Sequence, residues 1–222
     1  MAEKTNPESD GGQEAEGVNR KFRLSSKIVV TIVISVGTML FTAACSSRGY
    51  LKYPPYQTMQ SQNQEIFKAL GKFGEDGDWL VIRGYKQIDD QVSALTGGVL
   101  SHAGILDKDR WLVIESEKEG VHTTPIDLFL DKAHRLILVR PKWAKGKAGW
   151  EALLKARSLV GKPYNFSGIF GVKLTDSYYC SELAVEIYRT HFGKKDLIPA
   201  VVTPVNLLEW GKILYDSGAR EE

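Results

Sequence analysis

Two separate segments of the chain carry the residue types that thiol chemistry requires. The chain has 222 residues but only two cysteines, and Cys180 stands in the segment YYCSEL. Asp176 or Ser177 can cap a helix that starts near Tyr178. Cys180 would then lie in the first turn, where free amide donors and the helix dipole stabilise a thiolate. The competing interpretation is a small apolar residue on a packed helix, because free cysteines are often buried and inert.

A nucleophilic cysteine needs a base within hydrogen-bond reach and a third group that orients the base. The chain has four histidines. His122 follows a turn, His134 stands among charged residues, and His191 comes about three turns after Cys180, so none of these is well placed. His102 opens the apolar segment SHAGIL after a TGG bend, and this position favours it as the base.

The third group follows from the expected hairpin. If residues 107–110 form a four-residue loop, His102 lies opposite Glu115. Opposed residues in an antiparallel pair have Cβ atoms about 4.5–5.5 Å apart and share a face. The Glu115 carboxylate would then accept the Nδ1 proton of His102. An exposed cross-strand pair without chemistry is the alternative, and a loop differing by one residue would break the register.

These residues need a sheet and a set of helices to position them. Apolar runs predict strands at residues 79–82, 101–106, 111–116 and 135–140. Helical spacing predicts a short helix around residues 66–70, others near 89–95, 125–133 and 146–160, the helix of Cys180, and a last helix over 203–214. Segregated helices and an antiparallel sheet indicate the α+β class.

The N-terminal part has the order of an export signal. Basic residues between Arg20 and Lys27 precede the uncharged stretch 28–45, which ends in FTAAC. This ending resembles the lipobox of bacterial lipoproteins, which implies a lipidated Cys45 and leaves Cys180 as a free thiol. An uncleaved membrane anchor and ordinary signal cleavage are the alternatives. Residues 1–45 are thus expected to be the signal or anchor, 46–64 a flexible linker, and 65–222 the globular domain.

Each of these alternatives places the domain outside the cytoplasm, and the lipoprotein interpretation, which we prefer, anchors it to a membrane of the cell envelope. Ser46 lacks the acid that retains many lipoproteins at the inner membrane, which favours the outer membrane if the source has two. The 29 basic and 27 acidic residues are spread along the chain, and this argues against a nucleic-acid surface. The histidines and the cysteine lack the spacing of metal ligands, so we expect neither a metal nor another cofactor.

The segments SHAGI, VIES and YYCSEL, in that order, resemble the circularly permuted branch of the NlpC-type papain-like peptidases, the YiiX-like group of exported proteins. The similarity spans about residues 74–208. The histidine precedes the cysteine, which is the order that permutation implies. The resemblance implies a permuted papain-like fold with an antiparallel sheet packed against helices.

The resemblance also implies site residues. Cys180 would be the nucleophile, His102 the base and Glu115 the residue that orients it. Tyr164, in the segment GKPYNF, would line the substrate site, although it could equally be a packed aromatic in a turn. Relatives often have an acid after this tyrosine, whereas this chain has Asn165, which puts a charge role at that position in doubt.

We therefore expect a cysteine hydrolase that cleaves an amide bond, with cell-wall peptides as the first substrate class. An acyl-lipid amidase or acyltransferase on the same fold is the second interpretation, because permuted relatives include lipid acyltransferases. A lipoprotein that binds a ligand without turnover is the third. The five tryptophans could serve an apolar pocket, but their spacing is more typical of a core.

Overall fold

The structure is a computed structural model that describes residues 51–193 and 195–220. The chain divides into two units, and the described residues belong to the unit from Tyr50 to Glu222. The expected signal, its lipobox and Cys45 lie outside the described residues. Among residues 51–193 and 195–220, no helix has both the length and the apolar character needed to cross a bilayer.

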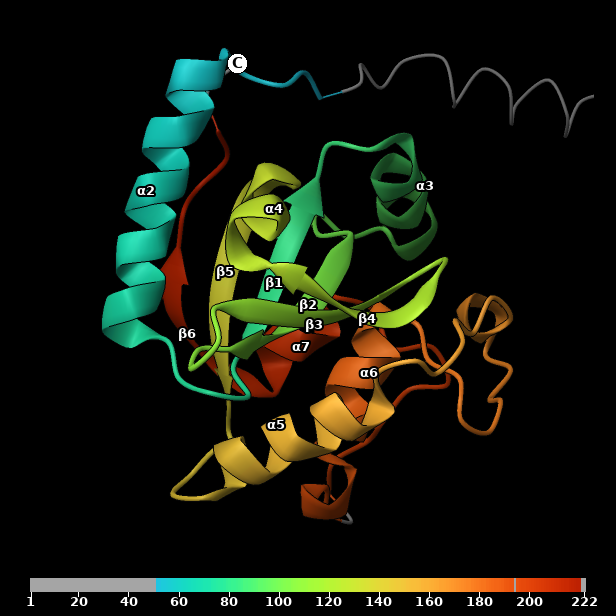
Figure 1. Cartoon of the computed structure of the whole chain (residues 1–222). Coiled ribbons are helices and arrows are strands. Elements are labelled where there is room, and N and C mark those ends of the chain that lie inside the picture. Colours follow the sequence, from blue (N-terminus) through green and yellow to red (C-terminus); the bar gives the residue numbers. More distant parts are fainter. Residues whose placement is uncertain (1–50, 194, 221–222) are drawn as a thin grey trace, which may run out of the picture. The chain divides into compact units, whose positions relative to one another are not determined.

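One six-stranded antiparallel sheet forms the centre of this unit (Figure 1). Its order is β4-β3-β2-β1-β5-β6, so the hairpin that carries the candidate histidine and glutamate lies beside the central strand β1. The strands are β1 (Trp79–Gly84), β2 (His102–Asp107), β3 (Leu112–Glu117), β4 (Gly120–Pro125), β5 (Ala133–Pro141) and β6 (Gly211–Asp216).

Helices cover the sheet, in agreement with the predicted α+β class. The α-helices are α2 (Tyr56–Phe73), α3 (Gln87–Thr96), α4 (Ile126–Asp131), α5 (Ala148–Leu159), α6 (Cys180–Glu186) and α7 (Asn206–Glu209). Two 3-10 turns, η1 (Gly168–Phe170) and η2 (Arg189–His191), flank α6.

The two faces of the sheet carry separate apolar clusters. Along β1, Trp79 and Val81 join the cluster that contains residues of α5, α6 and α7. Leu80 and Ile82 join the cluster that contains residues of α2 and α4. Side chains alternate across a strand, and a strand covered on both faces is apolar along its length. This explains why the segment WLVI lacks the alternation typical of a half-exposed strand.

The N-terminal boundary of the globular unit differs from the prediction. Residues 56–64, assigned to a linker from their Pro, Ser and Gln content, form the first half of α2. Asn63 holds this half through its side chain: its Nδ2 donates to Asp131 at 2.6 Å, and its Oδ1 accepts from Arg220 at 2.6 Å. These partners are far away in sequence, so composition alone could not reveal that the segment is packed.

The C-terminal segment also differs. The helix predicted over residues 203–214 is only the short α7, and the chain then enters β6. Gly211 starts this strand against β5, where an added Cβ would lie 2.3 Å from Val139 Cγ1 and 2.8 Å from the Arg140 carbonyl oxygen. Glycine permits that close approach. The edge strands β4 and β6 were both missed by the sequence analysis, because neither shows a clear apolar alternation.

Candidate active site

The register of the β2–β3 hairpin is shifted by two residues from the expected one. Gly104, not His102, pairs with Glu115, and the ladder ends at this pair. The connecting residues are 108–111, because Asp107 still pairs with Leu112. Asp107 is a buried strand residue whose two carboxylate oxygens each accept a hydrogen bond from Arg157 at 2.8 Å.

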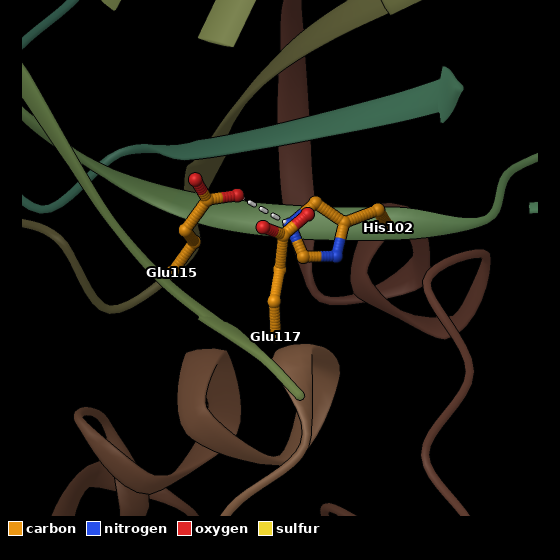
Figure 2. A group of neighbouring side chains, drawn as sticks. All are labelled: His102, Glu115 and Glu117. Atoms are coloured by element: carbon orange, nitrogen blue, oxygen red, sulfur yellow. Dashed lines mark hydrogen bonds and ion pairs between the residues drawn. The ribbon is translucent and has the colours of Figure 1, made fainter. Parts of the chain in front are cut away.

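A shift of two residues keeps every side chain on its expected face. Glu115 therefore lies diagonally across from His102 on the same face, within reach of a long side chain. His102 Nε2 donates to Glu115 Oε2 at 2.7 Å, and Glu115 is fully buried. Figure 2 shows this bond and the other ring nitrogen pointing away from Glu115. The expected hydrogen bond between His102 and Glu115 is present, but its donor atom is Nε2 and not Nδ1.

Cys180 is the first residue of α6, so its expected place in the first helical turn is confirmed. The predicted caps are wrong: Tyr179 is the N-cap residue, and neither Asp176 nor Ser177 caps the helix. The Ser116 hydroxyl on β3 donates to the Tyr178 carbonyl oxygen at 2.6 Å. This contact places the start of α6 beside the end of the β2–β3 ladder.

Cys180 is buried, the His102 side chain is 11% exposed, and each of the two groups stabilises the charged form of the other. Burial alone would lower the pKa of His102, but the hydrogen bond and charge of Cys180, followed by those of Glu115, raise it well above its ordinary value. Burial alone would raise the pKa of the Cys180 thiol. The hydrogen bond and charge of His102 outweigh burial, and the Ser181 hydroxyl and the Ala103 amide add to the lowering. The site thus favours a thiolate–imidazolium pair.

Glu115 has further partners that the sequence analysis missed. Its Oε1 accepts from the Lys132 ammonium at 2.6 Å and from the Thr124 hydroxyl. Burial alone would raise the pKa of Glu115, but the His102 hydrogen bond and charge, followed by the charge of Lys132, hold it well below its usual range. Lys132 ends α4, and no local pattern marks it among 29 basic residues.

His122 also lies at this cluster, although its position in the sequence argued against it. It is paired with Glu115 in the β3–β4 register, and its Nε2 lies 3.6 Å from Glu115 Oε1. The His122 Nδ1 donates a hydrogen bond to the Gly120 carbonyl oxygen at 2.9 Å. His122 thus approaches Oε1 of Glu115, whereas His102 is hydrogen-bonded to Oε2. Of the two remaining histidines, His134 is on β5 and His191 is exposed in η2.

His102, Glu115 and Glu117 bring one nitrogen and two carboxylates within 4.8 Å of one another (Figure 2). Residues of these types can ligate a metal ion, and the fold assembles them from positions without metal-ligand spacing in the sequence. The Lys132 ammonium already lies 2.6 Å from Glu115 and 3.2 Å from Glu117. Lys132 therefore pairs with both carboxylates, and Lys86, 3.6 Å from Glu117 Oε1, is a second cation at the cluster.

Tyr164 lies within electrostatic reach of Cys180. Burial, followed by the charge of Cys180, raises the pKa of the Tyr164 hydroxyl, which stays protonated at neutral pH. The following residue, Asn165, is fully buried, and its Nδ2 donates to Glu182 Oε2 at 3.2 Å. Glu182 thus braces the first turn of α6. The position after Tyr164 has a structural role and carries no charge.

Comparison with known proteins decides the family. Residues 75–207 match the permuted papain-like amidase family of YaeF and YiiX, known as the C92 peptidases. The chain belongs to this family. The predicted permuted papain-like fold is thereby confirmed, and the chemistry that the family supports is that of a cysteine hydrolase of the amidase class.

A solved structure, described as the metalloprotein YiiX from Escherichia coli O157:H7, is similar with a TM-score of 0.46 and 21% identity. The similarity covers 55% of this chain and 68% of the YiiX chain. The comparison with curated proteins gave no match. The family assignment therefore rests on residues 75–207 of the sequence itself.

Proposed function

We propose that this protein hydrolyses an amide bond with Cys180 as nucleophile, His102 as general acid and base, and Glu115 as the residue that orients the imidazole. The observation that carries the proposal is an imidazole that is hydrogen-bonded to a buried carboxylate while it and the Cys180 thiol stabilise each other's charged form. Because the Nε2 atom of His102 is hydrogen-bonded to Glu115, its Nδ1 atom is the one that exchanges the proton with Cys180. This is the arrangement of nucleophile, base and orienting group that covalent acyl transfer requires.

In the acylation step the Cys180 thiolate attacks the amide carbonyl carbon, and a carbon–sulfur bond forms. The imidazolium of His102 gives its Nδ1 proton to the amide nitrogen, the carbon–nitrogen bond breaks, and the amine leaves. A water molecule then gives a proton to His102 Nδ1 and attacks the thioester. The carbon–sulfur bond breaks, the acid is released, and the thiolate–imidazolium pair is restored.

The negative charge on the carbonyl oxygen needs donors in the transition state. The amide of Cys180 lies in the first turn of α6, where backbone N–H groups have no partner within the helix. Tyr164 supplies the second donor in this proposal, because its hydroxyl lies near Cys180 and remains protonated. Its role is then to bind the substrate through the oxygen that becomes charged.

We propose an envelope amide as the substrate, with peptide amides of the cell wall as the first candidate. The predicted export signal, with Cys45 lipidated and the domain outside the cytoplasm, supports this choice. A fatty-acyl amide is the second candidate, and one observation favours it: Phe166 and Phe170 are exposed on the loop that connects Tyr164 to α6.

Product analysis by mass spectrometry tests the proposal. The full-length protein is incubated with cell-wall peptide fragments and, separately, with N-acyl amides, and each reaction is compared with the Cys180→Ala variant. New acid and amine products that depend on Cys180 would support an amidase and identify the bond. The third interpretation, a binding protein without turnover, predicts the same spectra for both proteins with every substrate, and this result would overturn the proposal.

A further inference from the structure

The loop between α5 and α6 carries an unusual concentration of exposed apolar side chains. Single exposed apolar residues are normal on a protein surface, whereas a cluster of them marks an interaction site. Phe170 is 80% exposed and Phe166 65% exposed. Figure 1 shows this segment, with its 3-10 turn, projecting from the body of the domain. We call the following residues the apolar patch: Phe166, Phe170, Val172 and Leu174, with Ala200.

The two segments of the apolar patch meet at Gly171. A Cβ added to Gly171 would lie 3.5 Å from the Ala200 Cβ and 3.8 Å from Val201 Cγ2. Ala200 and Val201 therefore lie against the tip of the projecting loop. Leu197, on this second segment, is 85% exposed. The apolar patch is a combined surface and not a single loose loop.

The fold holds the loop in a defined shape while its apolar side chains remain exposed. Asn165, which is fully buried, donates to the Val172 carbonyl oxygen at 3.1 Å and accepts from the Ser167 hydroxyl at 3.0 Å. Gly168 packs against the Tyr179 ring, where an added Cβ would lie 2.4 Å from Cδ1. The hydrogen bond from Asn165 to Glu182 links the loop to the helix that begins at Cys180. A stable scaffold thus presents the apolar patch next to the reactive thiol.

The charges around the apolar patch are mainly positive. Lys173 stands between the apolar residues 172 and 174 and is exposed. On the second segment Lys195 is exposed, and the neighbouring Asp196 is paired with Lys142. Lys162, at the base of the loop, lies 3.3 Å from Asp176, which balances it. Aromatic and aliphatic side chains interleaved with lysines are typical of surfaces that enter the interface of an anionic membrane.

From these observations we propose that the apolar patch inserts into the surface of a lipid bilayer and holds the Cys180 site at the membrane. Two features favour a bilayer over a second protein. The apolar side chains project from a turn and a loop, and so offer no strand edge or groove for a peptide. The uncharged stretch 28–45, preceded by basic residues, is independently expected to hold the chain at a membrane. This docking does not depend on which bond Cys180 cleaves.

Fluorescence at single sites tests the docking in the full-length chain. Phe170→Cys is made in a background with Cys45→Ser and Cys180→Ala and is labelled with the environment-sensitive dye NBD. The matched control is Leu128→Cys, because Leu128 is an exposed apolar residue on α4, on the other face of the sheet. Both proteins are reconstituted into vesicles of phosphatidylcholine with phosphatidylglycerol, with and without nitroxide-labelled lipids.

We expect the NBD emission at residue 170 to shift to the blue and to be quenched several-fold more strongly than at residue 128. Interfacial segments enter about 5–10 Å beyond the headgroups, so a nitroxide near the headgroup should quench more than one at the chain end. Lys173→Glu should reduce this quenching. Equal, water-like emission at both sites would overturn the proposal. A blue shift at residue 170 that appears without lipid and grows with protein concentration would also overturn it, because it would indicate a second copy of the chain.

Discussion

Replacing Glu115 by glutamine tests whether the buried carboxylate controls the proton on His102. The Glu115→Gln side chain keeps the shape of glutamate, and its amide oxygen can still accept the Nε2 hydrogen bond, but the charge is lost. Lys132, 2.6 Å from Glu115 Oε1, stays positive and then opposes protonation of the imidazole. The imidazolium becomes less stable, and the thiolate that depends on it becomes less stable too.

The size of the effect follows from the geometry. A unit charge 2.7 Å from Nε2 contributes about 6 kcal/mol at an effective dielectric constant of about 20. The amide oxygen of the glutamine still accepts the Nε2 hydrogen bond and offsets part of this loss, so we expect the pKa of His102 to fall by about 1–3 units, the range usual for a close opposite charge. The reactive ion pair exists above the thiol pKa and below the imidazolium pKa. Glu115→Gln therefore narrows the pH range of the ion pair from both sides, because the pKa of the thiol rises and the pKa of the imidazolium falls.

The assay is the rate at which iodoacetamide alkylates Cys180, measured across the pH range by peptide mass spectrometry. In the wild-type protein the rate should form a wide plateau, because the pKa of Cys180 is lowered and that of His102 is raised. Glu117→Gln is the matched control, because Glu117 shares Lys132 but is not the hydrogen-bond acceptor of His102. The reasoning is refuted if the Glu115→Gln profile superimposes on that of the wild-type protein, or if Glu117→Gln shifts the profile equally.

Three further substitutions test separate parts of the account. Tyr164→Phe should lower kcat by about 10²–10³, as for loss of one oxyanion donor, while Cys180 alkylation is unchanged; an unchanged kcat would remove Tyr164 from the site. Lys132→Met should lower the free energy of unfolding at neutral pH by about 3 kcal/mol, because it leaves a buried carboxylate without its cation. This loss should shrink at acid pH, where Glu115 takes up a proton, and a pH-independent loss in urea titrations would contradict it. Gly104→Ala should cost about 1–3 kcal/mol in the same titrations, because its Cβ would lie 2.4 Å from Val113 Cγ1; wild-type stability would show that the hairpin relaxes.

Local signals predicted the central strands and the helix of Cys180. The segments WLVI and SHAGIL are apolar runs of strand length. Leu183, Ile187 and Tyr188 are buried as expected, although α6 ends at Glu186 and only Leu183 lies within it. The hairpin register was wrong by two residues because Asp107 was taken as a loop residue. Its burial depends on Arg157, 50 residues away, and no local pattern shows that contact.

The contact between His102 and Glu115 was predicted correctly despite the wrong register, for a geometric reason. The side-chain period of a strand is two, so an error of two residues changes an opposite pair into a diagonal pair on the same face. Lys132 and His122 could not be identified in this way. They reach Glu115 from α4 and β4, and their proximity depends on how three consecutive elements fold back on the sheet.

The most direct test of the central claim is the alkylation rate of Cys180 at pH 6 in the wild-type protein and in His102→Ala. We expect rapid alkylation of Cys180 alone in the wild-type protein, because the imidazolium keeps the sulfur ionised below the usual thiol pKa. In His102→Ala the rate should fall to that of an ordinary buried cysteine. Equal rates in the two folded proteins would contradict the account, because Cys180 would then owe none of its reactivity to His102.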